Sequence, residues 1–203
     1  MAHTFKLRAL ATTGVALAAS VALAACGDNT NQPGQSSPVN AAQDATSAVV
    51  GQTSAATLGA NTLQGYVTNA AIGDMYEIEA GRMAAERGTS AETRRLGEML
   101  VTDHTASSER MAPLARAAGE TPPTEMDERR KGLIDNLRAA QGAEFDRVFA
   151  SQQVAAHEEA LTLHRGYADN GDRAELQAFA RDLVPRLESH LEAARQLEAA
   201  HSR

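Results

Sequence analysis

The chain has 203 residues, a formal net charge of −7 at neutral pH and no tryptophan. Because an acidic body is repelled by phosphate and gains nothing from counterion release, these numbers exclude nucleic-acid binding as a function. Cys26 is the single cysteine, so the fold contains no internal disulfide. Only 3% of the residues are aromatic. The core must therefore be built from Leu, Met, Val, Ile and Ala, a composition that suits close helix contacts.

Residues 1–25 have the layout of an export signal, with two cations, a short apolar stretch and small residues at its end. The final segment, Leu23-Ala24-Ala25-Cys26, resembles the bacterial lipoprotein box. The resemblance implies cleavage before Cys26 and acylation of its thiol, with a membrane as the partner of the lipid anchor. Each buried methylene contributes about 0.8 kcal/mol, so several acyl chains hold a domain at a bilayer. Cleavage at another position, leaving a free or buried thiol, is the alternative.

Signal removal takes away Lys6 and Arg8, so the 19 cations fall to 17 against 26 carboxylates, a net charge of −9. Gly27 after the lipidated cysteine resembles a signal for the outer membrane, facing the periplasm, in a Gram-negative host. In a Gram-positive host the same anchor would lie in the plasma membrane. Residues 26–61 consist mostly of small and uncharged polar residues, which predicts a flexible tether with an end-to-end distance on the order of 30 Å.

From residue 62 onward the sequence predicts helices and no strand. Gly88 suits the left-handed position after the first helix, which we expect at 62–87. Thr89-Ser90-Ala91-Glu92 fits a capping box at the start of the second, which continues to about residue 118. A short helix is expected at about 125–140. Two further long helices are expected at about 143–168 and from about 172 to the C-terminus.

The four long helices have matched lengths of roughly 40 Å at 1.5 Å per residue, which favours a four-helix bundle. Short joints predict two antiparallel hairpins. The connection between the hairpins contains the short helix and is long enough to travel the length of the bundle, as in ferritin-like folds. The predicted fold is therefore all-α, a ferritin-like four-helix bundle over residues 62–203 with a short extra helix in the crossover connection.

One polar residue in each long helix falls on or beside the face expected to point inward: Glu77, His104, His157 and His190. Carboxylate and neutral imidazole are suitable ligands for iron, manganese or zinc, and bundle cores are where such sites are built. Counted from the joints, Glu77 and His104 lie at nearly the same height, whereas His157 and His190 are offset by one to two turns. Asp103 is placed to orient an imidazole through a hydrogen bond.

Each of these residues also has a simpler interpretation. A histidine on an apolar helix face is often a hydrogen-bonded core residue, and Glu77 and Glu79 suit solvated or arginine-paired positions. His164 and His201 are expected at the surface. The chain lacks the Glu-x-x-His pairs of di-iron bundles and any Ser/His/Asp arrangement. The sequence therefore favours a protein without enzymatic activity.

The stretch from about Gly65 to Ala199 resembles a bacterial domain-of-unknown-function family of exported ferritin-like proteins, often called putative outer-membrane proteins. The resemblance rests on short motifs in every long helix: Glu77-Ile78-Glu79-Ala80-Gly81, Asp103-His104, Phe145-Asp146, Val154-Ala155-Ala156-His157, Leu183-Val184-Pro185 and His190-Leu191. It implies a ferritin-like up-down bundle in the cell envelope with no established activity.

Two functions remain open from the sequence. The first is a cell-envelope lipoprotein whose bundle has a binding or structural role, without catalysis. The alternative is a metal-binding ferritin-like protein, linked to oxidative or envelope stress, that uses the Glu77, His104, His157 and His190 set. Assembly into a homo-oligomer through an exposed helix face also stays open, and the sequence does not reveal a protein partner.

Overall fold

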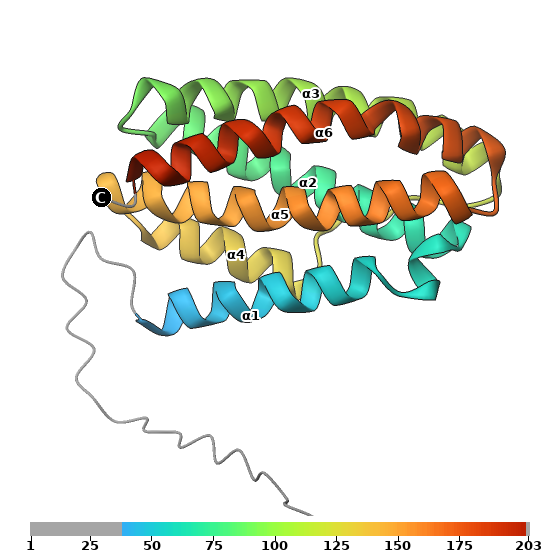
Figure 1. Cartoon of the computed structure of the whole chain (residues 1–203), viewed down its shortest axis with the longest axis horizontal. Coiled ribbons are helices and arrows are strands. Elements are labelled where there is room, and N and C mark those ends of the chain that lie inside the picture. The colour runs from blue at the N-terminus through green and yellow to red at the C-terminus, as the bar shows by residue number, and fades with distance from the viewer. Residues whose placement is uncertain (1–37, 202–203) are drawn as a thin grey trace, which may run out of the picture. The chain divides into compact units, whose positions relative to one another are not determined.

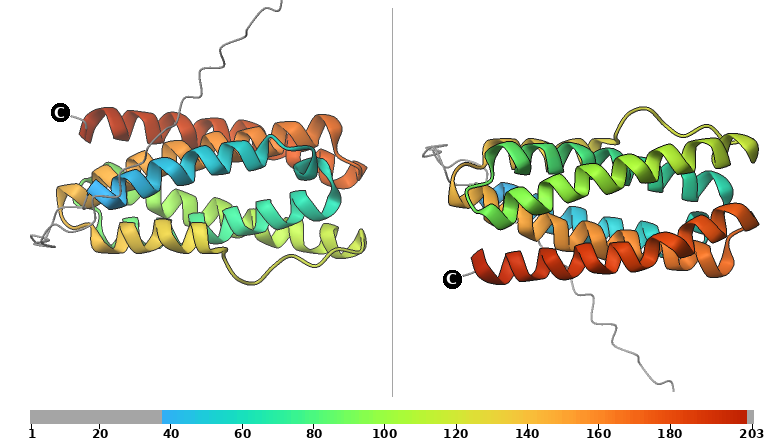
Figure 2. Two further views of the ribbon diagram at one scale, coloured as in Figure 1. Left: turned by 90° about the horizontal axis from the view of Figure 1, so that it is seen from below. Right: turned by 90° about the horizontal axis from the view of Figure 1, so that it is seen from above.

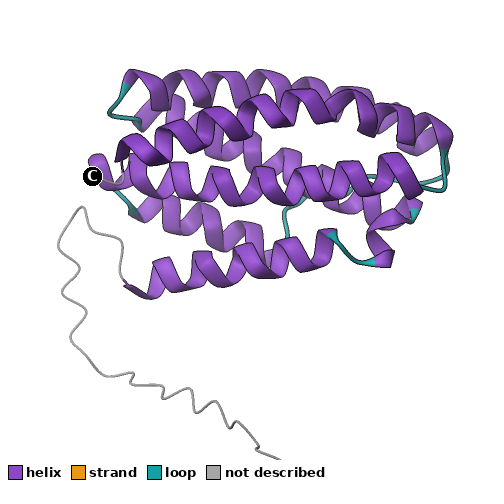
Figure 3. Cartoon of the chain, viewed as in Figure 1, coloured by secondary structure: helices purple, strands orange, loops and turns teal. Residues whose placement is uncertain are grey.

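The computed structural model describes residues 38–201, and within this range every regular element is helical (Figures 1 and 3). The elements are α1 (Pro38–Ala55), the 3₁₀ helix η1 (Leu58–Asn61), α2 (Leu63–Arg87), α3 (Ala91–Ala117), α4 (Glu128–Ala139), α5 (Ala143–Asn170) and α6 (Ala174–His201). The all-α class is confirmed for this part of the chain. The expected signal at 1–25 and Cys26 lie outside the described residues. Among the described helices, none combines the length and the apolar character needed to cross a membrane.

The four long helices pack as two hairpins, α2 with α3 and α5 with α6, and the hairpins meet through α3 against α6 and α2 against α5 (Figure 2). Asp146, near the start of α5, accepts hydrogen bonds from the Thr89 and Ser90 amides at the α2–α3 turn. The chain between α3 and α5 therefore returns along the bundle before α5 begins. This long connection contains α4, as the sequence predicts.

Close contact between α2 and α3 depends on two glycines that face each other. A Cβ atom on Gly97 would lie 2.5 Å from the Gly81 carbonyl oxygen, and one on Gly81 would lie 2.8 Å from the Gly97 carbonyl oxygen. Both distances are shorter than van der Waals contact, so only glycine permits this approach of the two backbones.

The apolar core is divided into two clusters. One contains Tyr66, Met111, Leu161, Phe179 and Leu187, and the other contains Tyr76, Leu100, Phe145, Phe149 and Leu197. Buried polar side chains, described below, lie at the same level of the bundle as the boundary between the clusters. The centre of the molecule is therefore polar although both ends of the core are apolar.

The turn between α2 and α3 differs in detail from the expected motifs. Gly88 has φ −55° and is not left-handed; glycine fits there because a Cβ atom would lie 2.6 Å from the Ala84 carbonyl oxygen. Ser90 caps α3 by accepting a hydrogen bond from the Thr93 amide, while Glu92 pairs with Arg95 instead of closing a capping box. The Thr89 and Ser90 amides at this turn donate to Asp146, a residue distant in sequence.

Helix α1 occupies much of the segment for which we expected a flexible coil, and that expectation is wrong from residue 38 to 55. The helix packs against α5 and α4 (Figure 1). Its inner face consists of small and polar residues: Asn40, Asp44, Ser47, Ala48, Gly51, Gln52 and Ala55. Asp44 accepts hydrogen bonds from Asn136 of α4 and Gln152 of α5. Tertiary polar contacts, and not an apolar stripe, therefore hold this helix.

Candidate metal centre

The polar layer at the middle of the bundle receives side chains from all four long helices. Helix α2 contributes Asp74 and Glu77, α3 contributes Asp103 and His104, α5 contributes His157, and α6 contributes His190. The three histidines are buried, with only 1% of His157 and of His190 exposed. The structure thus brings the three predicted histidines to one place in the core.

His104 is oriented by a carboxylate of α2. Its Nδ1 lies 2.8 Å from Asp74 Oδ1, and the Ser108 hydroxyl donates to the other oxygen of the same carboxylate at 3.1 Å. Because an ionised carboxylate only accepts, Nδ1 carries the proton. The lone pair of Nε2 is then free, and this buried atom has no hydrogen-bond partner among residues 38–201.

His157 and His190 face each other through the nitrogens that carry no proton. Nδ1 of His157 donates to the Gln153 carbonyl oxygen at 3.0 Å, and Nε2 of His190 donates to Asp103 Oδ2 at 2.9 Å. These outer bonds leave lone pairs on His157 Nε2 and His190 Nδ1, which lie 3.3 Å apart. Two lone pairs at this distance repel each other, and a proton or a metal cation between them removes the repulsion.

The three free nitrogens converge. One ligand atom from each histidine lies within 4.8 Å of the others, and the ring centroids are 5.3 to 5.8 Å apart. The expected offset of His157 and His190 by one to two turns is wrong, because their rings are in contact. Metal–imidazole bonds of about 2.0–2.1 Å place the ligand nitrogens of a tetrahedral site about 3.3–3.4 Å apart. The pair of nitrogens 3.3 Å apart already has this separation, and a movement of about 1.5 Å or less at the third histidine would complete a three-histidine metal site.

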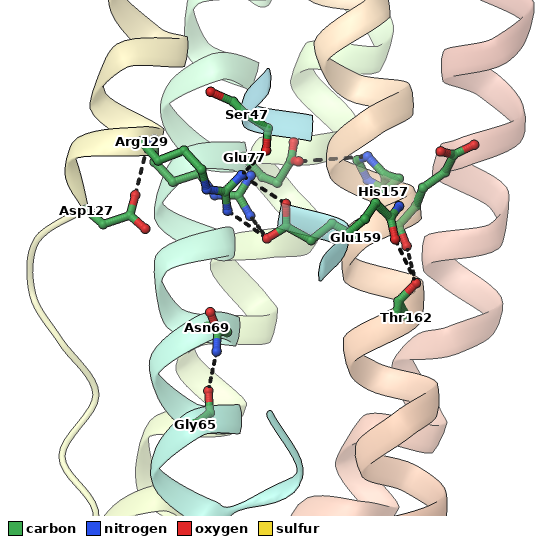
Figure 4. A network of polar contacts seen from close by, with 12 residues as sticks. Ser47, Gly65, Asn69, Glu77, Asp127, Arg129, His157, Glu159 and Thr162 are labelled. Carbon is green, nitrogen blue, oxygen red and sulfur yellow. Dashed lines mark hydrogen bonds and ion pairs between the residues drawn. The ribbon is translucent and has the colours of Figure 1, made fainter. Parts of the chain in front are cut away.

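Glu77 is buried beside the triad and is not solvated. Its Oε1 lies 3.8 Å from His157 Nδ1, the nitrogen that faces away from the other two histidines (Figure 4). Its Oε2 is buried and has no hydrogen-bond partner in the part of the chain that the structure describes. Burial raises the pKa of the Glu77 carboxyl to about 7, against opposing effects of His104 and Arg130. The structure does not bring Glu77 into the group of converging ligand atoms.

The surroundings set the protonation of the imidazoles. Burial lowers the pKa of His157 far below its ordinary value, helped by the neighbouring His104 and His190, and burial also lowers the pKa of His190. Burial acts in the same direction on His104, but the hydrogen bond and charge of Asp74 outweigh it and raise the pKa of His104. His157 and His190 are therefore neutral, and His104 is a basic donor, as metal ligands require.

His164 is buried, contrary to the expectation of a surface position. Its Nδ1 lies 2.9 Å from the Tyr66 hydroxyl, and burial lowers the pKa of His164 to about 4. His201 is partly buried, with Nε2 3.7 Å from Asp146 Oδ2. His164 lines the same cavity as His104 and His190, but it is not one of the three histidines whose ligand atoms converge.

A buried ion-pair cluster adjoins the site on the side of α4 (Figure 4). Glu159 accepts hydrogen bonds from both Arg129 and Arg130 at 2.8 Å, and Arg129 also donates to the Ser47 carbonyl oxygen of α1. The sequence reasoning missed this cluster and the role of Asp74. The only hint in the sequence is the pair of adjacent arginines, Arg129 and Arg130. Their partner Glu159 lies 29 residues or more further along the chain, so the sequence does not identify it.

The fold and the site define an all-helical bundle with a buried three-histidine centre. Residues 48–197 match the family described as domain of unknown function DUF4142, and the chain belongs to this family. No curated protein sequence matches the chain.

Solved structures of the protein CopM are similar to this fold. The Cu(II)-bound form has a TM-score of 0.60 at 19% identity, covering 68% of this chain and 97% of CopM. The Ag-bound form has a TM-score of 0.59 at 20% identity, covering 70% of this chain and 98% of CopM. At these identities the likeness concerns the fold.

Proposed function

We propose that this protein binds copper at His104, His157 and His190. The observation that carries the proposal is the orientation of the three rings: each holds its proton outward, on a carboxylate or a carbonyl oxygen, and presents its free lone pair to the same small volume. A hydrogen-bonded core needs no such convergence. Outer partners that fix the tautomer and raise ligand basicity are typical of metal-bound histidines.

Copper is favoured among the metals that imidazole binds. Neutral imidazole suits zinc, copper, iron and nickel, whereas manganese prefers oxygen ligands, and Cu²⁺ stands highest in the usual order of affinity. Asp74 and Asp103, each bound to a ligand histidine, offset the charge of a divalent ion. CopM, which shares the fold, has been solved with Cu(II) and with Ag. Zinc and iron, which the sequence also allows, are the alternatives for the same site.

We infer a role in holding the metal at the cell envelope, without catalysis. The single long crossover between two hairpins supports a ferritin-like bundle. The lipoprotein box ending at Cys26 supports a lipid anchor, which in a Gram-negative host would lie in the outer membrane and face the periplasm. Incorporation of radiolabelled palmitate, lost in Cys26→Ala, together with fractionation, tests the anchor. Sedimentation at several concentrations tests for a homo-oligomer.

Metal analysis of protein purified without a histidine tag tests the metal site. After loading with Cu(II) and removal of excess metal, we expect one copper per chain in the wild type and almost none in the His104→Ala, His157→Ala double variant. His201→Ala, with its histidine outside the triad, is the matched control and should keep the metal. Zinc and iron are loaded in parallel. Equal copper content in the double variant and the control would rule out the triad as the site.

A further inference from the structure

A small cavity adjoins two of the three histidines. It has a volume of about 30 Å³ and is lined by His104 and His190 together with Glu77 and Arg130. A single water needs roughly 10–15 Å³ on this measure. The cavity is thus large enough for one or two waters or for an ion of about three heavy atoms, and it is too small for an organic substrate.

Besides His104 Nε2, two buried polar atoms on the residues lining this cavity have no hydrogen-bond partner among the described residues: Oε2 of Glu77 and Nε of Arg130. Each residue is only 4% exposed. A buried polar group without a hydrogen bond costs about 1–3 kcal/mol, and such groups in native folds usually have a partner. One of these atoms is an acceptor and the other a donor. A small occupant that both accepts and donates a hydrogen bond, such as water or hydroxide, matches the pair.

The charges around the cavity favour an anionic occupant once a metal is present. Glu159 is shared by Arg129 and Arg130, so this cluster of one carboxylate and two guanidinium groups has a net charge of +1. Asp74 and Asp103 are each engaged with a histidine of the triad. The cations Arg129, Arg130 and Arg186 stand against the carboxylates Asp74, Glu77, Asp103 and Glu159, so three positive and four negative charges give this layer a net charge of −1. A divalent ion changes this to +1 in a region of low dielectric, where an uncompensated charge is costly.

The protein supplies three converging nitrogens, and Glu77 stands outside that group. A four-coordinate ion held by three protein ligands keeps one position for a ligand from solution. We propose that the metal in this site keeps an open coordination position, directed into the cavity, where a water or hydroxide exchanges with small inorganic anions held by Arg130. This inference rests on the proposed metal binding and deepens it, because it names the class of ligand that the bound metal takes.

Azide titration of the copper-loaded protein tests the open position. Azide bound to Cu(II) gives a charge-transfer absorption band, so we expect a saturable one-site increase in this band and a matching change in the electron paramagnetic resonance spectrum. Arg130→Gln should weaken azide binding about tenfold or more, since a charge-assisted hydrogen bond is lost. Arg129→Gln removes the same charge from a residue that does not line the cavity, and should weaken azide binding less than Arg130→Gln does.

The outcomes separate this inference from the proposed function. A protein that binds no copper overturns both. A protein that binds one copper per chain but shows no spectral response to azide has a closed metal site, which overturns only the open position. Equal weakening by Arg129→Gln and Arg130→Gln would assign the effect to general charge and remove Arg130 from the site. The wild-type titration decides the question even if the Arg130 variant fails to fold.

Discussion

At the scale of single residues, the centre is defined by where each imidazole keeps its proton. Asp74, Asp103 and the Gln153 carbonyl oxygen hold the outer protons, so the inner nitrogens are left as donors to a cation. His157 Nε2 and His190 Nδ1 lie 3.3 Å apart with their lone pairs facing each other, and this contact is unfavourable in the absence of a cation. The same contacts that orient the rings therefore create the affinity that we propose.

Loss of the Asp103 charge should weaken metal binding without removing a ligand. In Asp103→Asn the His190 ring loses its anionic partner, and we expect the copper dissociation constant to rise about 10- to 100-fold. A competition assay with a chelator of known affinity measures it. Asp182→Asn is the control, because Asp182 pairs with Arg110 at the surface and touches no histidine. Equal affinities for the two variants would show that Asp103 does not act on the metal.

The sequence alone could place His104, His157 and His190 on inward faces, because helical periodicity fixes which residues share a side. It could not give the heights of His157 and His190, since a joint at Gly171 that shifts the helices by a few ångströms changes the offset by a turn. It also could not give the orientation of the rings. The partners of those rings come mostly from other helices, and for the same reason His164 was expected at the surface and a solvated position stayed open for Glu77.

At the scale of helices, the α2–α3 pair depends on backbone contact at Gly81 and Gly97. Gly97→Ala would set a methyl group 2.5 Å from the Gly81 carbonyl oxygen, and we expect it to destabilise the fold by about 1–3 kcal/mol. Gly73→Ala is the matched control in α2, because nothing lies within 4 Å of its added Cβ atom. Because alanine loses less conformational freedom on folding than glycine, Gly73→Ala should stabilise the fold by about 0.5–1 kcal/mol. Urea unfolding measures both, and destabilisation by both variants would contradict this packing.

The docking of α1 depends on Gly51. A Cβ atom on this residue would lie 1.9 Å from Glu159 Oε2, so a larger side chain forces α1 away from the Arg129–Glu159 pair. We expect Gly51→Leu to make α1 sensitive to limited proteolysis and to speed its amide hydrogen exchange, while α5 and α6 stay protected. Val50→Ala, at an outward position 48% exposed, is the control. Unchanged protection of α1 in Gly51→Leu would show that this contact does not hold the helix.

The bounds of the long helices were predictable because glycines, prolines and capping residues mark them in the sequence. Helix α1 was not, since its inner face is small and polar and gives no apolar periodicity. What fixes α1 is a set of partners in α4 and α5, about 80 to 110 residues away in the chain, such as Arg129 for Ser47 and Thr162 for Gln52. Propensity within a short Ala-rich window carries no information about such partners.

At the scale of the whole described bundle, Asp146 joins the two hairpins at one end. Its carboxylate accepts from the Thr89 and Ser90 amides and from the Thr89 hydroxyl. Burial acts to raise the pKa of Asp146, but these hydrogen bonds prevail and lower it below its ordinary value. The stabilisation is therefore fully present above the unfolded-state pKa of about 3.9 and is lost as the pH falls through the folded-state value.

Unfolding of the wild type and Asp146→Asn across pH tests this joint. Asparagine keeps one acceptor and loses the charge, and we expect the variant to be less stable at neutral pH by on the order of 1 kcal/mol. The difference should shrink as the pH is lowered below about 4, because the wild-type carboxylate is then protonated first in the unfolded chain and, at lower pH, in the folded protein. A difference that stays constant down to the lowest pH at which both proteins fold would contradict the role of the charge.

The central claim is that one metal ion sits among three imidazoles in the middle of the bundle. X-ray absorption at the copper edge of the loaded protein observes those ligands directly. We expect a first shell dominated by nitrogen at about 2.0 Å, with the outer-shell scattering of three imidazole rings, reduced to two rings and weaker metal retention in His157→Ala. A first shell of oxygen or sulfur, or a spectrum that His157→Ala leaves unchanged, would contradict it.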